Sequence, residues 1–424
     1  MRAKRPSWGG HFYHSPLLFA MNFWNHFTAA PHRVMFFGGA LQTLFAMLWW
    51  LFELATRYVF PQYSVTWLLF PAAIHSWLML FGLLPFFFFG FLMTTFPRWM
   101  AGSDIPARHF VPAFLFMFSG ILLFYGGLLF WRALLVPASL SLLAGWAMGL
   151  YALLRVLLDT RPNDKRHPIV LFIAFSIGWL ALATFLLWQI TEMEALRQLA
   201  LRAALWGFLL PVFATVAHRM FPFFTASALK VQEVPRPFWA LWIILAASLV
   251  HGSLEYFNLH AWLWLVDLPL ALAALTLSYL WGLRRSFTNP LLAVLHVGFA
   301  WLVIAMLLYS VQSLWLWWHG SYIWSLAPLH ALTLGFFATV VIGMGTRVTL
   351  GHSGLPFVID RPVKLMFAGM QGVALLRVLA DLLPWQSGHW LYLAAALGWL
   401  ACFTPWVWRY LPAYWRPRAD GQPG

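Results

Sequence analysis

Histidines inside apolar segments are the residues of this sequence whose chemistry stands out. The stretch from His330 to His352 is mostly apolar between its two histidines and carries Arg347 near its end. Another apolar stretch begins at His75 and places Met79 one helical turn later. An ionisable side chain inside an apolar helix is costly without a purpose, so these imidazoles are candidate ligands. Two histidines on different helices could hold one haem iron from both faces.

The composition decides where such helices would lie. Of the 424 residues, 62% are hydrophobic and only 9% are charged, whereas soluble domains carry about 25% charged residues. Apolar runs of about twenty residues recur from end to end, which is typical of a polytopic membrane protein. The formal net charge of +14 could indicate nucleic acid binding. With so few charges spread thinly over loops, it fits a membrane-topology signal better, and we expect no nucleic acid partner.

The cysteine content limits the chemistry further. Cys402 is the single cysteine, which excludes an intramolecular disulfide framework and thiolate metal clusters. A metal would therefore be held by histidine, methionine or carboxylate. The sequence shows no GxSxG, paired-carboxylate or HExxH arrangement, so no catalytic residue is assigned.

We predict an all-α fold, a polytopic membrane helix bundle of about twelve transmembrane helices in one integral membrane domain over residues 1–424. Residues 1–33 would be an N-terminal cytoplasmic or interfacial segment, 34–411 the bundle and 412–424 a cytoplasmic tail. Polar residues interrupt the start of the chain, so we expect a retained segment and not a signal peptide. The predicted spans are 34–58, 68–95, 110–132, 135–158, 168–190, 199–218, 238–256, 261–282, 291–317, 326–349, 364–384 and 390–410.

Basic residues predict the direction of the spans. One predicted side of the membrane and its helix ends hold 21 of the 26 Lys and Arg residues. The other side holds only Arg57, Arg132, Arg197, Arg202 and Arg377. By the positive-inside rule the first side is cytoplasmic, and both termini lie there. Acidic residues lean towards the outer halves of spans, as Glu53, Glu255, Asp267 and Asp381 do.

Depth along the helices then separates the histidines into two groups. His330 and His352 are 22 residues apart, or about 33 Å along a helix, so they cannot bind the same metal ion. His75 lies about seven residues and His330 about five residues below the outer surface, by the rise per residue. We predict that His75 and His330 are the axial ligands of one haem, with Met79 beside them.

A second set of candidates could bind another metal or form a polar cluster, namely His296, His352, Arg347, His251 and His218. We expect Arg347, His352 and His296 to lie together near the cytoplasmic side, apart from the haem. An arginine cannot ligate a metal, so Arg347 would hold an anionic group or orient a neighbour. The alternative is that Arg347 is only an anchor at the membrane surface and that His218 and His352 are solvated there.

The second and tenth predicted spans resemble each other. When Trp77 is aligned with His330, Gly82 meets Gly335 and Gly90 meets Gly343. Both stretches also end in a threonine-containing segment that bears an arginine. Glycines at this spacing allow a flat partner or another helix to approach closely. Chance similarity between two apolar helices is the alternative.

Several segments, in order along the chain, resemble the NnrS family. They are HRVMFFGGALQTLFAMLWW, GFLMTTFPRW, RMFPFFT, VLHVGFAWL and HALTLGFFATVVIGMGTRVTLGHSG, and the last is the most specific. The resemblance implies a multi-pass protein of the bacterial inner membrane, linked to nitric oxide and its stress and to denitrification. It also implies haem, of b type, with copper as a second candidate cofactor. The implied partners are the lipid bilayer, nitric oxide or a related small gas, and an unidentified electron donor.

This sequence departs from the family pattern in the second span. The family reads His-x-His-Glu-Met there, whereas this chain has Trp77 and Leu78 at the second histidine and the glutamate. The first histidine, His75, and the methionine, Met79, are present. The same stretch and the one that begins at His330 are distantly similar to the haem-ligand helices of haem–copper oxidase main subunits, a likeness of fold only. The adjacent double histidine that helps bind copper in those oxidases is absent.

Three functions follow as hypotheses. The first is an NnrS-like haem protein of nitric oxide metabolism or tolerance. The second is a polytopic transporter that moves a metal, haem or a small anion along a histidine-lined pathway. The third is a sensor or assembly partner without turnover. An optical spectrum of the purified protein separates the first from the second, because only a resident haem gives a Soret band.

Overall fold

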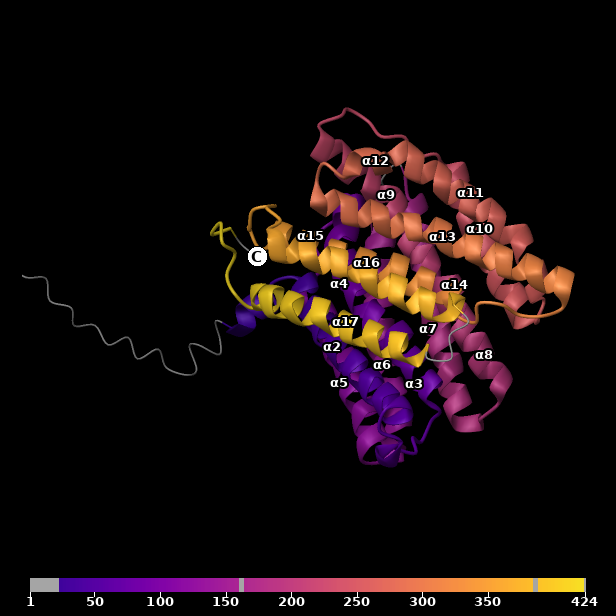
Figure 1. Cartoon of the computed structure of the whole chain (residues 1–424). Helices are drawn as coiled ribbons and strands as arrows, with labels where there is room; N and C mark the ends of the chain where they lie inside the picture. Colours follow the sequence, from indigo (N-terminus) through magenta and orange to yellow (C-terminus); the bar gives the residue numbers. More distant parts are fainter. Residues whose placement is uncertain (1–22, 160–163, 384–387, 423–424) are drawn as a thin grey trace, which may run out of the picture.

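The computed structural model describes residues 23–159, 164–383 and 388–422. Within these ranges the regular structure is helical, without strands, and twelve helices are long and apolar enough to cross a membrane (Figure 1). The predicted all-α membrane bundle is therefore confirmed. Residues 1–22 of the predicted N-terminal segment lie outside the described residues.

Each of the twelve predicted spans has one counterpart in the structure. Three of them are composite, because a π-helical segment follows a short α-helix. In chain order the spans are α2 (Pro31–Tyr58), α3–η2–α4 (Pro71–Trp77, Leu78–Leu83, Leu84–Trp99), α5 (Ala107–Leu129), α6 (Leu135–Asp159), α7 (Arg166–Thr191), α8–η4–α9 (Glu194–Arg202, Ala203–Leu209, Leu210–Leu229), α10 (Phe238–Tyr256), α11 (Trp264–Trp281), α13 (Pro290–His319), α14–η6–α15 (Ala327–His330, Ala331–Ala338, Thr339–His352), α16 (Arg361–Leu382) and α17 (His389–Tyr410). The connections hold the short helix α12 (Leu283–Ser286) and the 3₁₀ turns η1 (Pro61–Tyr63), η3 (Arg132–Leu134) and η5 (His260–Trp262), and the 3₁₀ turn η7 (Leu411–Tyr414) follows the last span.

The sixth span is longer than predicted. We expected it to end at residue 218, but α9 continues to Leu229 and ends where Lys230 takes a left-handed conformation with φ of 52°. Arg219 does not stop the helix, because its guanidinium lies over the ring of Trp99, 4.6 Å from the centroid. Pro222 is also accommodated inside the helix.

The spans close into a ring with a repeat of four. In each successive group of four the third span packs on the fourth, as α5 on α6, α10 on α11 and α16 on α17. The fourth span packs on the first of the next group, as α6 on α7 and α11 on α13, and α17 returns to α2. In Figure 1 the last helix runs beside the first. The indole Nε1 of Trp399 donates to the carbonyl of Thr43 at 2.9 Å across this closing contact.

Both ends of the described chain lie at one end of the bundle, which we name the terminal end; the opposite end is the cavity end. The Arg33 guanidinium donates to the carbonyl of Arg416 at 2.8 Å, and the amide of Ala419 donates to the carbonyl of Ser353 at 2.9 Å. An even number of spans requires such an arrangement. His352 lies at the terminal end, and His330 lies towards the cavity end.

The second span of each group of four is central. The composite spans that contain η2, η4 and η6 are the most buried of the twelve. Each π-helical segment contains a glycine, at Gly82, Gly207 and Gly335. A π-helical turn is wider than an α-helical turn and is often found at functional sites.

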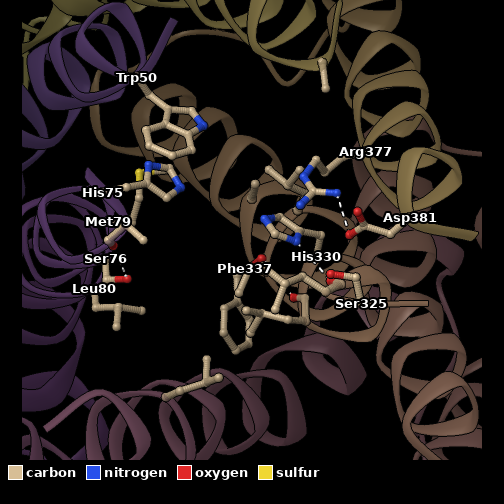
Figure 2. Close-up of a pocket in the computed structure, with 18 of the residues that line it drawn as sticks. Trp50, His75, Ser76, Met79, Leu80, Ser325, His330, Phe337, Arg377 and Asp381 are labelled. Atoms are coloured by element: carbon tan, nitrogen blue, oxygen red, sulfur yellow. Dashed lines mark hydrogen bonds and ion pairs between the residues drawn. The ribbon is translucent and has the colours of Figure 1, made fainter. Parts of the chain in front are cut away.

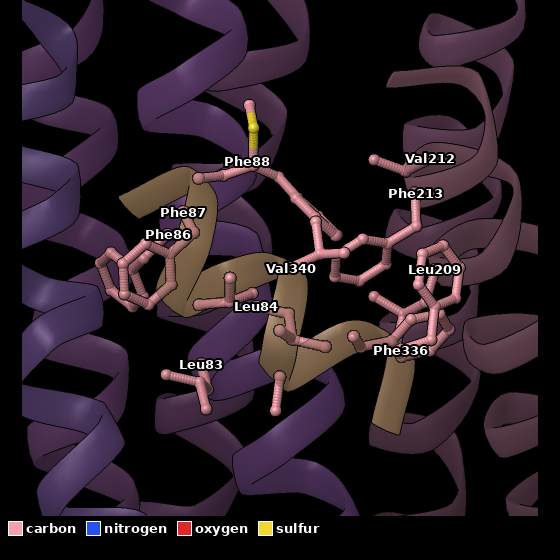
Figure 3. Packing of buried hydrophobic residues seen from close by; sticks show 14 of the residues in the cluster. Leu83, Leu84, Phe86, Phe87, Phe88, Leu209, Val212, Phe213, Phe336 and Val340 are labelled. Carbon is pink, nitrogen blue, oxygen red and sulfur yellow. The ribbon is translucent and has the colours of Figure 1, made fainter. Parts of the chain in front are cut away.

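Aromatic side chains join the three central spans (Figure 3). Phe88 of α4 packs edge-on against Phe213 of α9 with ring centroids 4.9 Å apart. Phe213 then stacks on Phe337 of η6 at 4.3 Å with 3° between the planes. Aromatic contacts of this kind add to the free energy gained from burial. They fix the three helices against one another beside the cavity that Phe337 lines.

Candidate functional site

A cavity of about 660 Å³ opens at the cavity end of the bundle. This volume is within the range of about 300–1,000 Å³ that is common for small-molecule and cofactor sites. The walls are mostly apolar and come from the first and last spans as well as from all three central spans. Such a site can enclose a flat apolar group and present a few polar side chains to it.

His75 and His330 both line this cavity. Figure 2 shows His75 with Met79 and Trp50 on one side and His330 with Arg377 and Asp381 on the other. Each histidine stands on the short α-helix that precedes a π-helical segment, α3 before η2 and α14 before η6. The sequence-based pairing of these two residues at one depth therefore corresponds to a shared cavity. Their ligation of haem stays a prediction.

The His75 ring is held by stacking. It lies on the indole of Trp50 with ring centroids 4.2 Å apart and 21° between the planes. Its Nδ1 atom is buried without a hydrogen-bond partner among the described residues. Met79 lines the cavity one turn further along the chain. A buried imidazole nitrogen without a partner is a feature that a ligand or metal could explain.

The His330 ring has a defined tautomer. Its Nδ1 atom lies 3.0 Å from the carbonyl oxygen of Leu326. Because a carbonyl can only accept, Nδ1 must carry the hydrogen, which leaves the lone pair of Nε2 available to a metal. A backbone acceptor of this kind is the usual partner of the second nitrogen of a metal-bound histidine.

Three arginines line the same cavity, Arg57, Arg202 and Arg377. Arg57 is paired with Glu53, whose second carboxylate oxygen accepts from Trp67 Nε1 at 2.5 Å. From the sequence alone these arginines serve only as markers of topology. The structure shows that three of the five basic residues assigned to the outer side face an internal space.

The other two arginines of the cavity differ in their pairing. The Nη1 atom of Arg377 lies 2.7 Å from Asp381, which also accepts from the hydroxyl of Tyr392 at 2.6 Å. Arg202 makes no ion pair within 4.0 Å with any residue that the structure describes, and its Nε atom is buried without a hydrogen-bond partner. Arg202 is therefore the one cavity arginine that forms no ion pair with a carboxylate of the described residues.

His251 belongs to a separate buried group beside the cavity. Its Nδ1 atom lies 2.6 Å from Oδ1 of Asp267, and its Nε2 atom lies 3.4 Å from Oε1 of Glu255. Glu255 also lines the cavity. His251 is a candidate from the sequence, whereas the two carboxylates are known from the sequence only by their position in the outer halves of spans.

The candidates at the terminal end have different partners from those expected. His352 lies against His32, with ring centroids 4.5 Å apart. The Nε2 atom of His296 is 2.9 Å from the hydroxyl of Thr225. The Arg347 guanidinium lies over the ring of Phe224 at 3.8 Å.

His218 has yet another partner. Its Nδ1 atom is 2.9 Å from Nε2 of His167, and its own Nε2 is 3.2 Å from the carbonyl of Pro237. Each of the five candidates of the second set therefore contacts a different partner. Among the described residues, no group of three or more His, Cys, Asp or Glu side chains is arranged to hold a metal ion.

Trp77 and Leu78, which stand where the family pattern has a histidine and a glutamate, are not among the residues that line the cavity. Both side chains are fully buried. Trp77 stacks on Phe124 of α5 with ring centroids 3.7 Å apart and 5° between the planes. The substitution therefore changes the packing between the second and third spans and leaves the cavity face with His75 and Met79 intact.

No curated protein matched the chain. The profile of the NnrS protein family matches residues 26–418, a range that holds all twelve spans, the cavity and its histidines. The chain therefore belongs to the NnrS family.

Proposed function

We propose that the protein is a haem-containing membrane protein of nitric oxide metabolism or tolerance. In this proposal His75 and His330 are the axial ligands of one haem in the cavity. The observation that carries it is the position of these two imidazoles on opposite sides of a single apolar cavity (Figure 2). Bound haem would supply an iron that can change its oxidation state.

The residues of the cavity fit such a group. His330 has one nitrogen fixed as a donor to the Leu326 carbonyl, and His75 has a buried Nδ1 atom without a partner. A haem also carries two carboxylates, which prefer cationic and hydrogen-bonding neighbours. Arg57, Arg202 and Arg377 supply three guanidinium groups in the same cavity.

The nitric oxide role is supported by family membership and by the apolar walls of the cavity. A small uncharged gas enters apolar surroundings at little cost, unlike an ion, whose desolvation is expensive. Copper is a second candidate cofactor by the family resemblance. The structure offers no preformed group of three or more His, Cys, Asp or Glu ligands for it within the described residues.

We propose the bacterial inner membrane as the location, with both termini cytoplasmic. The positive-inside rule supports this orientation, because basic residues are concentrated at the terminal end. The cavity would then open towards the outer side. Its occupant could exchange electrons or small ligands with that side of the membrane.

The test is a reduced-minus-oxidised spectrum of the purified protein with metal analysis, recorded with and without nitric oxide. We expect a Soret band with split visible bands, and its loss in His75→Ala and in His330→Ala. His319→Ala is a matched control, because His319 is exposed at the end of α13. An unchanged spectrum in both cavity variants would refute the ligand assignment.

A transporter of a small anion is the second candidate. Arg202 favours it, because this partly buried cation has no ion pair with a described residue and lines the cavity. Colourless, fully folded protein would refute a resident haem and favour transport. In that case Arg202→Gln should abolish uptake of nitrite or another small anion into proteoliposomes, whereas Arg132→Gln should not.

A further inference from the structure

Asp267 and His251 form a closely bonded pair inside the bundle. Both side chains are inaccessible to solvent. Oδ1 of Asp267 and Nδ1 of His251 are 2.6 Å apart, which is short for a hydrogen bond between nitrogen and oxygen. One of these atoms must carry a proton for the contact to form, so the pair holds at least one exchangeable proton.

The second ring nitrogen of His251 points towards a residue of the cavity wall. Nε2 of His251 lies 3.4 Å from Oε1 of Glu255, without the geometry of a hydrogen bond. The second oxygen of Glu255 accepts from Trp206 Nε1 at 2.9 Å. Because Glu255 lines the cavity, three titratable groups run in sequence from the interior of the bundle to the cavity wall.

The imidazole between the two carboxylates has restricted freedom. It packs on the Trp206 ring with centroids 3.6 Å apart and lies edge-on to Tyr309 at 4.8 Å. Tyr309 also lines the cavity. Proton transfer requires donors and acceptors held in reach of each other, and these rings hold His251 in position.

Other titratable and charged groups face this chain of residues. Arg202 of α8 and His260 of η5 are close enough to Glu255 for their charges to interact with it. Tyr309 of α13 and Tyr322, which follows that helix, complete this side of the cavity. The carboxylate of Glu255 therefore meets a cation from the sixth span as well as the imidazole from its own helix.

Two atoms of the group have no hydrogen-bond partner among the described residues, Nε2 of His251 and Oδ2 of Asp267. A purely structural network would be expected to satisfy its buried polar atoms, because leaving them unpaired costs free energy. The unpaired Nε2 is the atom that faces Glu255. A proton placed between these two atoms would complete the chain.

We propose that His251 and Glu255 form a proton-transfer chain, with Asp267 holding the imidazole in place, and that Glu255 exchanges a proton with a ligand in the cavity. The imidazolium gives its Nε2 proton to Oε1 of Glu255, and Glu255 passes a proton to a basic atom of the ligand. The ring keeps its Nδ1 hydrogen bond to Asp267 throughout. The steps reverse when the ligand returns a proton, and no electrons are transferred.

This inference rests on the cavity being a ligand site, as in the proposed function, but not on the ligand being haem. The test uses the full-length purified protein in detergent and follows its carboxyl bands by infrared difference spectroscopy during pH titration and exchange into D₂O. We expect one titrating carboxyl band to disappear in Glu255→Gln. Because Glu255 lines the cavity, this band should shift within the mixing time in D₂O.

Coupled titration of the three residues distinguishes a proton-transfer chain from a single carboxylate that titrates alone. Asp267→Asn and His251→Gln should each move the midpoint of the Glu255 band by about one pH unit, a tenfold change in proton affinity, because interacting sites titrate together. Glu255→Asp should shift the band instead of removing it, which separates a lost proton carrier from misfolding. Asp360→Asn, at the terminal end, should leave the band unchanged.

The proposal is wrong if the band persists in Glu255→Gln or if its midpoint is the same in Asp267→Asn and His251→Gln as in the unmodified protein. The visible spectrum of the same samples reports separately on haem. Protein without haem but with coupled carboxyl titration would overturn the haem assignment and leave the proton chain standing.

Discussion

The imidazole of His75 stacks on the indole of Trp50, with ring centroids 4.2 Å apart and 21° between the planes. The second span thus presents its histidine to the cavity in an orientation set by the first span. Without this contact the ring could rotate about χ1 and χ2 and leave the cavity wall.

Trp50→Leu should therefore weaken haem retention without abolishing it. Ring contacts of this kind contribute about 0.5–1.5 kcal/mol, which corresponds to about a twofold to tenfold loss in affinity. Haem content per protein after washing with a haem scavenger measures the effect. The control is Trp390→Leu, an exposed tryptophan at the start of α17. Equal haem retention in both variants would contradict a positioning role.

Arg377→Met should destabilise the protein strongly. The substitution removes the guanidinium from Asp381, whose side chain is only 2% exposed. Breaking a buried ion pair costs about 3–5 kcal/mol, because the remaining charge is left buried. The hydroxyl of Tyr392 still donates to Asp381, so we expect the lower end of this range. Thermal unfolding in detergent is the measurement.

Two comparisons sharpen this prediction. Arg132→Met breaks an exposed pair with Glu192, whose side chains are 59% and 75% exposed, and should cost about 0–1 kcal/mol. Combining Arg377→Met with Asp381→Asn should recover part of the stability, since no charge is then left buried. A double variant as unstable as the single variant would show that the loss has another cause.

The orientation can be tested with reporter fusions. A reporter after Gly424 should behave as cytoplasmic, and one inserted between Tyr63 and Ser64 should behave as periplasmic. An even number of spans and the contacts between the two chain ends require both termini on one side. A periplasmic reporter after Gly424 would reverse every depth assignment.

Asp360 should make stability depend on pH. Its Oδ1 atom accepts from the amide of Val363 at 3.3 Å at the start of α16, and its Oδ2 atom accepts from Arg409 at 2.7 Å. The hydrogen bond from Arg409 holds the pKa of Asp360 below its ordinary value of 3.8. A folded-state pKa below the unfolded one stabilises the protein above the ordinary carboxyl pKa, and this contribution is lost as the pH falls through the folded value.

Asp360→Asn keeps an acceptor for α16 but removes the charge. We expect its Tm to be below that of the unmodified protein at neutral pH, with the difference shrinking below about pH 4 and disappearing once the pH falls through the folded-state pKa of Asp360. Melting curves between neutral and acidic pH test this. A difference in Tm that stays constant over the whole range would exclude the carboxylate as its source.

Restoring the family pattern in the second span should not alter the cavity. Trp77→His combined with Leu78→Glu replaces two buried side chains, and it removes the stacking of Trp77 on Phe124 of α5. We expect lower stability, because a glutamate would be buried there without a partner and the ring stacking would be lost. The haem spectrum should be unchanged. New metal binding or a changed spectrum would show that position 77 reaches the cofactor.

The sequence predicted the spans well because each apolar run is long enough to cross a bilayer and each break is polar. It also paired His75 with His330, because depth along a helix follows directly from residue number. Helix direction and depth do not depend on which way each side chain points around the helix axis, so both could be predicted from the sequence.

The rotation of each helix about its own axis could not be predicted from the sequence. His352 and His296 were expected together because their depths agree, yet His352 lies against His32 and His296 against Thr225. Helices that are apolar on all sides show no polar face that would fix their rotation. For the same reason Arg57 and Arg377 could be placed at the outer side but not pointed into the cavity.

The sixth span was predicted, but its central position was not, although the sequence contains a signal for it. LFGLLPF in the second span and LWGFLLPVF in the sixth share a glycine followed by leucines and a proline. The similarity between the second and tenth spans does not include this pattern, so it gave no sign of a repeat in the sixth span. Its recognition would have predicted that Arg202 stands beside His75 and His330 at the cavity.

The closing contact between the first and last helices has a consequence for biosynthesis. Thr43 and Trp399, which form the hydrogen bond across it, both line the cavity. The ribosome makes Thr43 long before Trp399, because 356 residues separate them, and until α17 inserts, the cavity lacks one wall. Any occupant is therefore enclosed only after α17 has inserted, so chains truncated before α17 should reach the membrane without holding it.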